Sequence, residues 1–339
     1  MSTLTLANGI TYHYTDSGQP IESQYKTLIL IHGHSFNSGI FRKLLPLAPS
    51  QALRLICIDR REYNGSTPFT SEELRIIKNG NDEERASFLA EQGLLIALFI
   101  DGLIQNLALP IHCGGAISGW SLGNLYSLAM INAIDHPKLP QDVRERLKVF
   151  LWTYIIWEIP SYILGIESPP GSYVPLWDYD LPEEDRGPVF GTYISSFFDH
   201  GTDVLAGHNI PLLNHRNPTP GTSTIEKMTQ EEILSSTNFL VGPKCDTIVL
   251  EPPYYGTHRT NLRKALLDDI SSVDKWGMDV WHIYGDSCSW NVVLSPWILE
   301  EQCLKANKKV HFRTIADANH FLMWEDPERA IAVLKECLV

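Results

Sequence analysis

The segment Gly119-Trp120-Ser121-Leu122-Gly123 constrains the fold most, because it lies between an apolar run and a segment with helical spacing. Residues 111–117 have the pattern of a short buried strand, and residues 122–135 carry apolar side chains at helical intervals. A sharp turn from strand to helix needs glycine at its flanks, since a side chain there would block the neighbouring backbone. The pattern predicts that Ser121 is a nucleophile held above a sheet, with the backbone N–H of Leu122 facing a developing oxyanion.

Strand-like and helical segments alternate along much of the chain. Apolar runs typical of strands cover residues 10–15, 27–32, 53–59, 149–157, 279–285 and 309–315. Helical spacing is clearest over residues 86–106, and residues 327–338 are expected to form the last helix. This alternation is typical of an α/β fold, with a mostly parallel central sheet flanked by crossover helices.

The alternation stops between about residues 160 and 274. This stretch is rich in proline, glycine and aromatic residues, and it is too long for an ordinary loop. We therefore expect a core made of residues 1–159 and 275–339, into which residues 160–274 are inserted as a largely helical lid. The expected position of the lid is over the carboxyl ends of the strands, where open α/β sheets bind their ligands.

Composition excludes several classes of partner. The chain of 339 residues has a net charge of −13, which gives no basic surface for nucleic acid or an anionic membrane. No run of about 18 apolar residues and no leader pattern is present, so a cytoplasmic protein is expected. The six cysteines are scattered without metal-ligand or disulfide spacing, and no cofactor or metal is implied. The sequence does not indicate an oligomeric state.

A nucleophilic serine needs a base and an acid to orient that base. His320 is the expected base, because it follows the last predicted strand and precedes the last predicted helix. The backbone N–H of His34, in the loop after the strand at residues 27–32, is the expected second oxyanion donor. The alternative for His34 is a turn residue whose ring faces solvent.

Six motifs occur in the order and spacing of the α/β-hydrolase superfamily: HGHSFNSGIF, IDRREYNGST, GWSLG, WEIP, IYGD and ANHFLMWEDPE. On these motifs the chain resembles that superfamily over nearly its whole length outside the lid. Among its members the chain is similar to lidded hydrolases of fungal secondary-metabolite and toxin pathways. That resemblance implies hydrolysis of an ester or lactone, or release of a polyketide chain from a carrier thioester by hydrolysis or ring closure. The implied partner is a hydrophobic small molecule or a carrier-bound acyl group.

The acid departs from the usual superfamily pattern, since Cys288 stands where many members place an aspartate. A mostly protonated thiol cannot orient a histidine well. Asp286 lies in the same loop at another offset, and Glu158 ends the strand at residues 149–157. We favour Glu158, because a lone buried carboxylate needs a partner such as His320. The alternative role for Glu158 is a lid hinge paired with an arginine.

The identity of the nucleophile and the aromatic residues of the lid indicate the type of reaction and the type of substrate. A serine at position 121, in place of an aspartate, disfavours the dehalogenase and epoxide-hydrolase reactions and favours acyl transfer. Aromatic side chains in and near the lid indicate an apolar substrate site, although most of them could form the lid's own core. The candidates for substrate contact are Trp120, Trp157, Tyr162, Trp177 and Phe198. The predicted function is a serine acyl hydrolase or acyltransferase; the alternatives are a catalytically silent binding protein and a non-hydrolytic cyclase.

Overall fold

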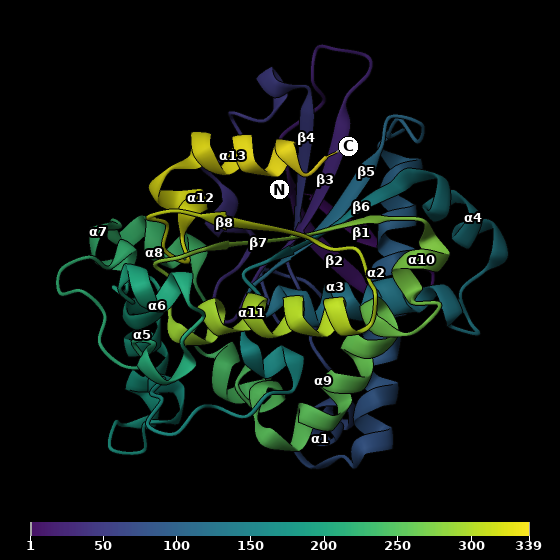
Figure 1. Cartoon of the computed structure of the whole chain (residues 1–339). Coiled ribbons are helices and arrows are strands. Elements are labelled where there is room, and N and C mark those ends of the chain that lie inside the picture. Colours follow the sequence, from purple (N-terminus) through teal and green to yellow (C-terminus); the bar gives the residue numbers. More distant parts are fainter. Residues whose placement is uncertain (1, 339) are drawn as a thin grey trace.

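The computed structural model describes residues 2–338 and places an eight-stranded sheet at the centre of the molecule (Figure 1). The strands lie in the order β1-β2-β4-β3-β5-β6-β7-β8. Strands β1 and β2 are antiparallel to their neighbours, and all other pairs are parallel. The bounds are β1 Ser2–Thr5, β2 Thr11–Asp16, β3 Lys26–Ile31, β4 Leu53–Ile58, β5 Gly115–Trp120, β6 Leu151–Trp157, β7 Asp279–Gly285 and β8 His311–Ile315.

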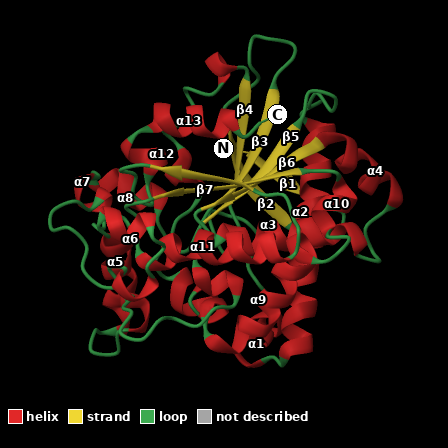
Figure 2. Cartoon of the chain, in the orientation of Figure 1, coloured by secondary structure: helices red, strands yellow, loops and turns green. Residues whose placement is uncertain are grey.

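Helices cover both faces of this sheet (Figure 2). Helices α12 (Leu322–Glu325) and α13 (Pro327–Glu336) lie on one side, and α3 (Gly123–Asn132) and α11 (Trp290–Lys305) lie on the other (Figure 1). Helix α4 (Gln141–Phe150) leads directly into β6. The mixed sheet flanked by helices confirms the expected fold class.

Helix α2 (Asp82–Asn106) begins at a capping box formed by Asn81 and Glu84. Among the described residues it is the one helix long and apolar enough to cross a membrane by length and composition, with a mean hydropathy of 1.6 over its most apolar 18 residues. In the structure 72% of that stretch is buried inside the protein, largely against α3. Its apolar character is that of a core helix, and the helical pattern at residues 86–106 lies within it.

The parallel register aligns the carboxyl ends of the strands that carry the candidate site. Ile31 of β3 pairs with Gly119 of β5, and Trp120 pairs with Trp157 of β6. The residues that follow these strands therefore start from one edge of the sheet. Gly285, the last residue of β7, pairs with Ile315 of β8 at the same edge.

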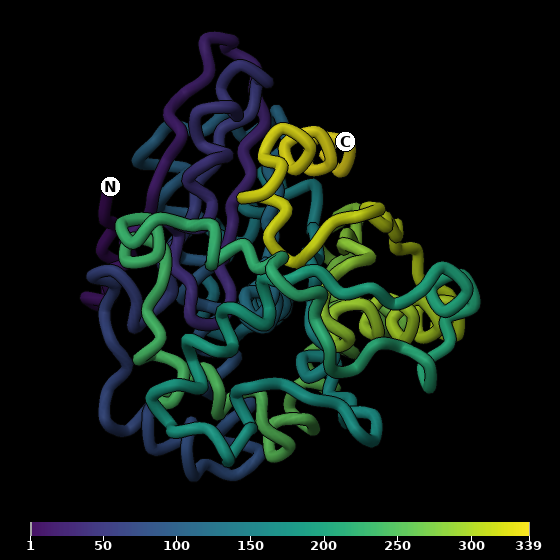
Figure 3. The backbone as a smooth tube through the Cα atoms, turned by 90° about the vertical axis from the view of Figure 1, so that its left-hand side faces the viewer, coloured from purple at the N-terminus to yellow at the C-terminus, as the bar shows by residue number. Residues whose placement is uncertain are grey.

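The segment between β6 and β7 is helical and contributes no strand to the sheet within the described residues. Figure 3 shows its teal and green tube lying below and beside the core strands. Its helices are α5 (Glu183–Ile194), α6 (Thr202–Ala206), α7 (Thr224–Lys227), α8 (Gln230–Ser236), α9 (Tyr255–Leu262) and α10 (Ser272–Trp276), joined by shorter helical turns. Helix α9 packs against α2 and α3, so the last part of the insertion rests on core helices.

Several sequence expectations differ from the observed elements. The strand expected at residues 149–157 is β6, Leu151–Trp157, because residues 149 and 150 end helix α4. The strand expected at residues 111–117 is β5, Gly115–Trp120, because a turn at residues 110–113 and a positive φ of 87° at Gly114 delay its start. The short strand β1 was not expected; it pairs with β2 across a tight turn that contains Gly9. The expected strand at residues 279–285 coincides with β7.

Candidate active site

Ser121 lies on a sharp turn between β5 and α3, with a φ of +54°. A Cβ on Gly119 would be 2.5 Å from the backbone nitrogen of Asn124, and one on Gly123 would be 2.1 Å from the carbonyl oxygen of Ile31. These two glycines are therefore required by close backbone packing. The serine residue is partly accessible although the residues on both sides of it are buried. The turn thus presents a strained, reachable hydroxyl at the carboxyl edge of the sheet.

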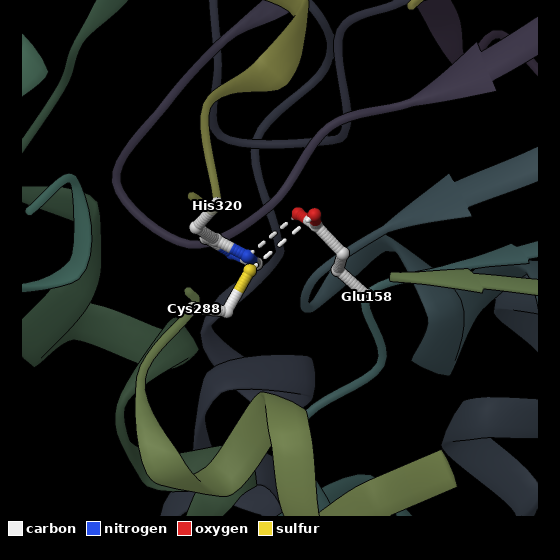
Figure 4. Close-up of side chains that lie close together, drawn as sticks. All are labelled: Glu158, Cys288 and His320. Carbon is white, nitrogen blue, oxygen red and sulfur yellow. Dashed lines mark hydrogen bonds and ion pairs between the residues drawn. The ribbon is translucent and has the colours of Figure 1, made fainter. Parts of the chain in front are cut away.

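Glu158 and His320 contact each other, although 162 positions separate them along the sequence. Nδ1 of His320 is 2.8 Å from Oε2 of Glu158, and both side chains are buried (Figure 4). The distance is that of a hydrogen bond, but the ring is not aligned for a linear one. Glu158 follows β6 with a φ of +52°, a backbone conformation that non-glycine residues rarely adopt. This contact supports Glu158 as the acid that orients His320.

The carboxylate of Glu158 has partners on both oxygens. Trp120 Nε1 donates to Oε2 at 3.1 Å, the Gly285 N–H donates to Oε1 at 3.2 Å, and the Cys288 thiol lies 3.5 Å from Oε1. The indole of Trp120 also stacks on the His320 ring, with centroids 4.8 Å apart. A buried carboxylate with this set of donors is satisfied without an arginine, which disfavours the hinge alternative.

Glu158, Cys288 and His320 could formally supply three metal ligands, since their donor atoms lie within 4.8 Å of one another. Burial and the neighbouring Glu158 carboxylate raise the pKa of the Cys288 thiol well above its ordinary value, so the sulfur stays protonated. The protonated thiol is a donor toward the carboxylate, 3.5 Å from Oε1 of Glu158. The cluster therefore fits an orienting acid with a neutral thiol beside it.

Asp286 has a different partner. Its Oδ1 accepts hydrogen bonds from the Asp317 N–H at 2.7 Å and from the Ser287 hydroxyl at 3.2 Å. Within residues 2–338 it forms no ion pair with His320. Asp286 thus braces the loop that leads to His320, and its position does not favour it as the orienting acid.

The loop after β3 lies directly beside Ser121. A Cβ on Gly33 would be 2.8 Å from Cβ and 3.3 Å from Oγ of Ser121. The backbone N–H groups of His34 and Leu122 donate no hydrogen bond to any described residue. An oxyanion donor needs such an N–H group without another acceptor, so the prediction for His34 and Leu122 is compatible with this structure. The His34 ring is buried and lies 2.9 Å from the Thr247 hydroxyl through Nε2, so it does not face solvent.

Ser121 and His320, the expected nucleophile and base, are not hydrogen-bonded to each other in this structure. Nε2 of His320 has no hydrogen-bond partner among the described residues. Ser121 and His320 are linked through Trp120, which neighbours the serine and stacks on the imidazole. Catalytic hydrogen bonds are often long before substrate binds. A rotation of the Ser121 side chain would change the separation between its Oγ and Nε2 of His320.

The loop that carries His320 is fastened by its neighbour Asn319, which the sequence analysis did not single out. Nδ2 of Asn319 donates to the Ser195 carbonyl at 2.7 Å and to the Thr224 hydroxyl at 2.9 Å. Both partners belong to the inserted segment. The position of the histidine loop therefore depends on the insertion, and no local sequence signal could have indicated that.

The five aromatic candidates for substrate contact fall into two groups. Trp120, Trp157 and Phe198 are at most 1% exposed and pack inside the protein, so their positions favour a structural role. Tyr162 and Trp177 line a cavity of about 330 Å³. Trp177 also lines a second cavity, of about 170 Å³, that reaches His34.

The fold of this chain is similar to that of several solved enzyme structures. No protein-family model and no curated protein sequence matches the chain. A carboxylesterase of Nitrososphaera gargenis has a TM-score of 0.51 at 15% identity, with 99% of this chain and 97% of the esterase covered. A thioesterase domain from the curacin biosynthetic pathway has a TM-score of 0.51 at 14% identity, with 98% of both chains covered. Epoxide hydrolase A from Mycobacterium thermoresistibile has a TM-score of 0.53 at 14% identity, with 100% and 99% covered. These solved structures are hydrolytic enzymes, and the similarity over the whole length shows that this chain has the α/β-hydrolase fold.

Proposed function

We propose that this protein is a serine acyl hydrolase that acts on a neutral, hydrophobic ester, lactone or thioester. The observation that carries the proposal is the 2.8 Å contact between His320 and Glu158 at the edge of the sheet where Ser121 stands on a strained turn. An acid, an imidazole and a hydroxyl are the three groups that serine acyl transfer requires.

In the first half of the reaction, Nε2 of His320 takes the proton of Ser121 as Oγ bonds to the substrate carbonyl carbon. The N–H groups of His34 and Leu122 stabilise the negative oxygen of the tetrahedral intermediate. The intermediate then expels an alkoxide or thiolate, which receives the proton from Nε2. Glu158 stabilises the imidazolium that exists between these two proton transfers.

In the second half, Nε2 of His320 removes a proton from water, whose oxygen attacks the acyl carbon. Collapse of the second intermediate returns the proton to the Ser121 oxygen and releases the acid. A hydroxyl group of the same substrate could replace water, in which case the product is a lactone. The resemblance to fungal secondary-metabolite hydrolases supports a polyketide acyl group, free or bound to a carrier, as a candidate substrate for either outcome.

The preference for a neutral, hydrophobic substrate depends on the larger of the two cavities that Trp177 lines. The larger one is lined by aromatic and small polar side chains, without a charged residue among its lining. Its volume of about 330 Å³ is in the range of ligand sites in enzymes. The smaller cavity is lined by His34 of the expected oxyanion loop and by Phe239, together with the charged side chains of Glu183, Arg186 and Glu251.

The test is hydrolysis of a series of p-nitrophenyl esters and acyl thioesters by the wild-type protein, Ser121→Ala and Ser50→Ala. We expect turnover by the wild type and by Ser50→Ala, which changes an exposed serine, and a loss of at least about 10³-fold in Ser121→Ala. Equal turnover by Ser121→Ala would refute the proposal. Binding of the esters without turnover by any of the three proteins would favour a silent binding protein instead. With His320→Ala assayed as a fourth protein, product formation that is lost in that variant but kept in Ser121→Ala would favour a cyclase.

A further inference from the structure

A buried ion pair joins the loop after β4 to the inserted segment. Arg60 follows β4, and Asp246 ends the helical turn η7 (Gly242–Asp246) of the insertion. The guanidinium donates two hydrogen bonds to the carboxylate, at 3.0 and 2.6 Å. The side chains of Arg60 and Asp246 are 4% and 1% exposed. Burial of both charges costs several kcal/mol, so the pair is poorly explained as a source of stability alone.

The same guanidinium also holds the backbone of the loop beside Ser121. Nε of Arg60 donates to the His32 carbonyl at 3.1 Å, and one terminal nitrogen donates to the Gly33 carbonyl at 2.9 Å. In a planar trans peptide the N–H of the next residue points opposite to the carbonyl. Arg60 therefore fixes the directions of the N–H groups of Gly33 and His34. The latter is the expected oxyanion donor.

A second link runs through Tyr63. Its hydroxyl donates to Asp246 at 2.6 Å and accepts the N–H of Ser35 at 3.1 Å. Ser35 has a φ of +62°, a strained conformation that the surroundings must maintain. The rings of Tyr63 and Tyr126 each lie 4.9 Å from the Arg60 guanidinium and hold its plane in place.

We propose that Arg60 and Asp246 form a clamp that positions the peptide groups of residues 32–35 for oxyanion binding and makes this geometry depend on the position of the insertion. Both are positioning residues, because they act on the substrate only through the loop. The catalytic part of this inference rests on the proposed acyl-transfer function, whereas the mechanical part does not. Displacing the insertion would leave Arg60 buried without its partner and would release the two carbonyls it orients.

The chain offers a closely matched control in the next residue. Arg61 is also buried, pairs with the Glu73 carboxylate and donates to two carbonyls, those of Thr67 at 3.1 Å and Pro68 at 2.7 Å. Its carbonyls belong to a loop other than the one beside Ser121. A change at Arg61 therefore perturbs a similar network without loosening residues 32–35.

The experiment compares Arg60→Lys, Asp246→Asn and Arg61→Lys with the wild type by amide hydrogen exchange and by ester hydrolysis. Lysine keeps the charge but cannot bind the carboxylate and both carbonyls at once. We expect exchange at residues 32–36 to become at least tenfold faster in Arg60→Lys and Asp246→Asn, and to be unchanged in Arg61→Lys. The effect of Asp246→Asn is decisive for the coupling, because Asp246 forms no hydrogen bond with residues 32–35 among the described residues.

In the hydrolysis assay we expect kcat to fall about 10- to 100-fold in Arg60→Lys, with KM within about threefold of the wild type, since misplacing an oxyanion donor affects the transition state. Arg61→Lys should keep both constants within about threefold. Wild-type exchange at residues 32–36 in Arg60→Lys would overturn the clamp, and wild-type exchange there in Asp246→Asn would overturn its dependence on the insertion. Faster exchange with unchanged kcat would overturn its catalytic role. A wild-type protein that hydrolyses no ester would refute the proposed function, and the exchange data would still decide the clamp.

Discussion

Replacing Glu158 by glutamine tests the orienting acid with almost no change in shape. The wild-type carboxylate is 2.8 Å from Nδ1 of His320 and fully buried. At an effective dielectric constant of about 20, a charge pair at that separation interacts by about 6 kcal/mol. The imidazolium forms only during the reaction, so this interaction lowers the barrier more than it strengthens substrate binding.

The carboxamide keeps part of the interaction, because its dipole can still face the ring. We therefore expect Glu158→Gln to lose about 4 to 5 kcal/mol of transition-state stabilisation, or about 10³- to 10⁴-fold in kcat. KM should change little. The control is Asp286→Asn, which alters the neighbouring loop and should retain kcat within about threefold.

The assay is steady-state hydrolysis of the best p-nitrophenyl ester, together with thermal unfolding of each variant. Glu158→Gln must remain folded at the assay temperature for the comparison to count, because Trp120 and Gly285 donate to different carboxylate oxygens and the single carboxamide oxygen can keep only one of these two bonds. A loss below about tenfold in Glu158→Gln, or a larger loss in Asp286→Asn than in Glu158→Gln, would refute the assignment of the acid.

Three further predictions concern neighbours of the site and the core. Gly33→Ala should lower kcat by at least about 10²-fold, because the new Cβ would lie 2.8 Å from Cβ of Ser121; ester kinetics with wild-type activity would contradict that close packing. Adding Cys288→Asp to Glu158→Gln should restore kcat at least about tenfold, since the sulfur position lies within 4.8 Å of the imidazole; no gain in the double variant would show that position 288 cannot serve His320. Burial lowers the pKa of His282 to about 3, so the folded state excludes a proton that the unfolded chain binds below its ordinary pKa of 6.5. The contribution of the neutral His282 ring to the free energy of unfolding is complete above pH 6.5 and is lost as the pH falls toward 3. In urea titrations between these pH values, His282→Leu should reduce the slope of the unfolding free energy against pH by about 1.4 kcal/mol per pH unit. An unchanged slope would contradict the lowered pKa of His282.

The parts of the site that follow from local sequence could be predicted. The glycines around Ser121 are required by contacts a few residues away or on the adjacent strand, so the turn has a recognisable pattern. Glu158 was favoured because an isolated carboxylate after a buried strand needs a partner. The structure supplies His320 as that partner.

The parts that depend on distant pairing could not be predicted. Arg60 and Asp246 lie 186 positions apart, and each residue alone resembles an ordinary charged loop residue. Trp120 is one of the candidates for substrate contact predicted from the sequence. Its indole instead lies against Glu158 and His320, where it donates a hydrogen bond and stacks. Such roles depend on which chain segments meet after folding, and a single sequence carries no local signal for that.

The most direct test of the central claim is covalent labelling with a fluorophosphonate, followed by peptide mapping by mass spectrometry. The proposed chemistry predicts a single adduct on Ser121, absent from Ser121→Ala and formed at least about 10²-fold more slowly in His320→Gln. A protein that hydrolyses esters without any adduct at Ser121, or an adduct whose formation is indifferent to His320, would contradict the account.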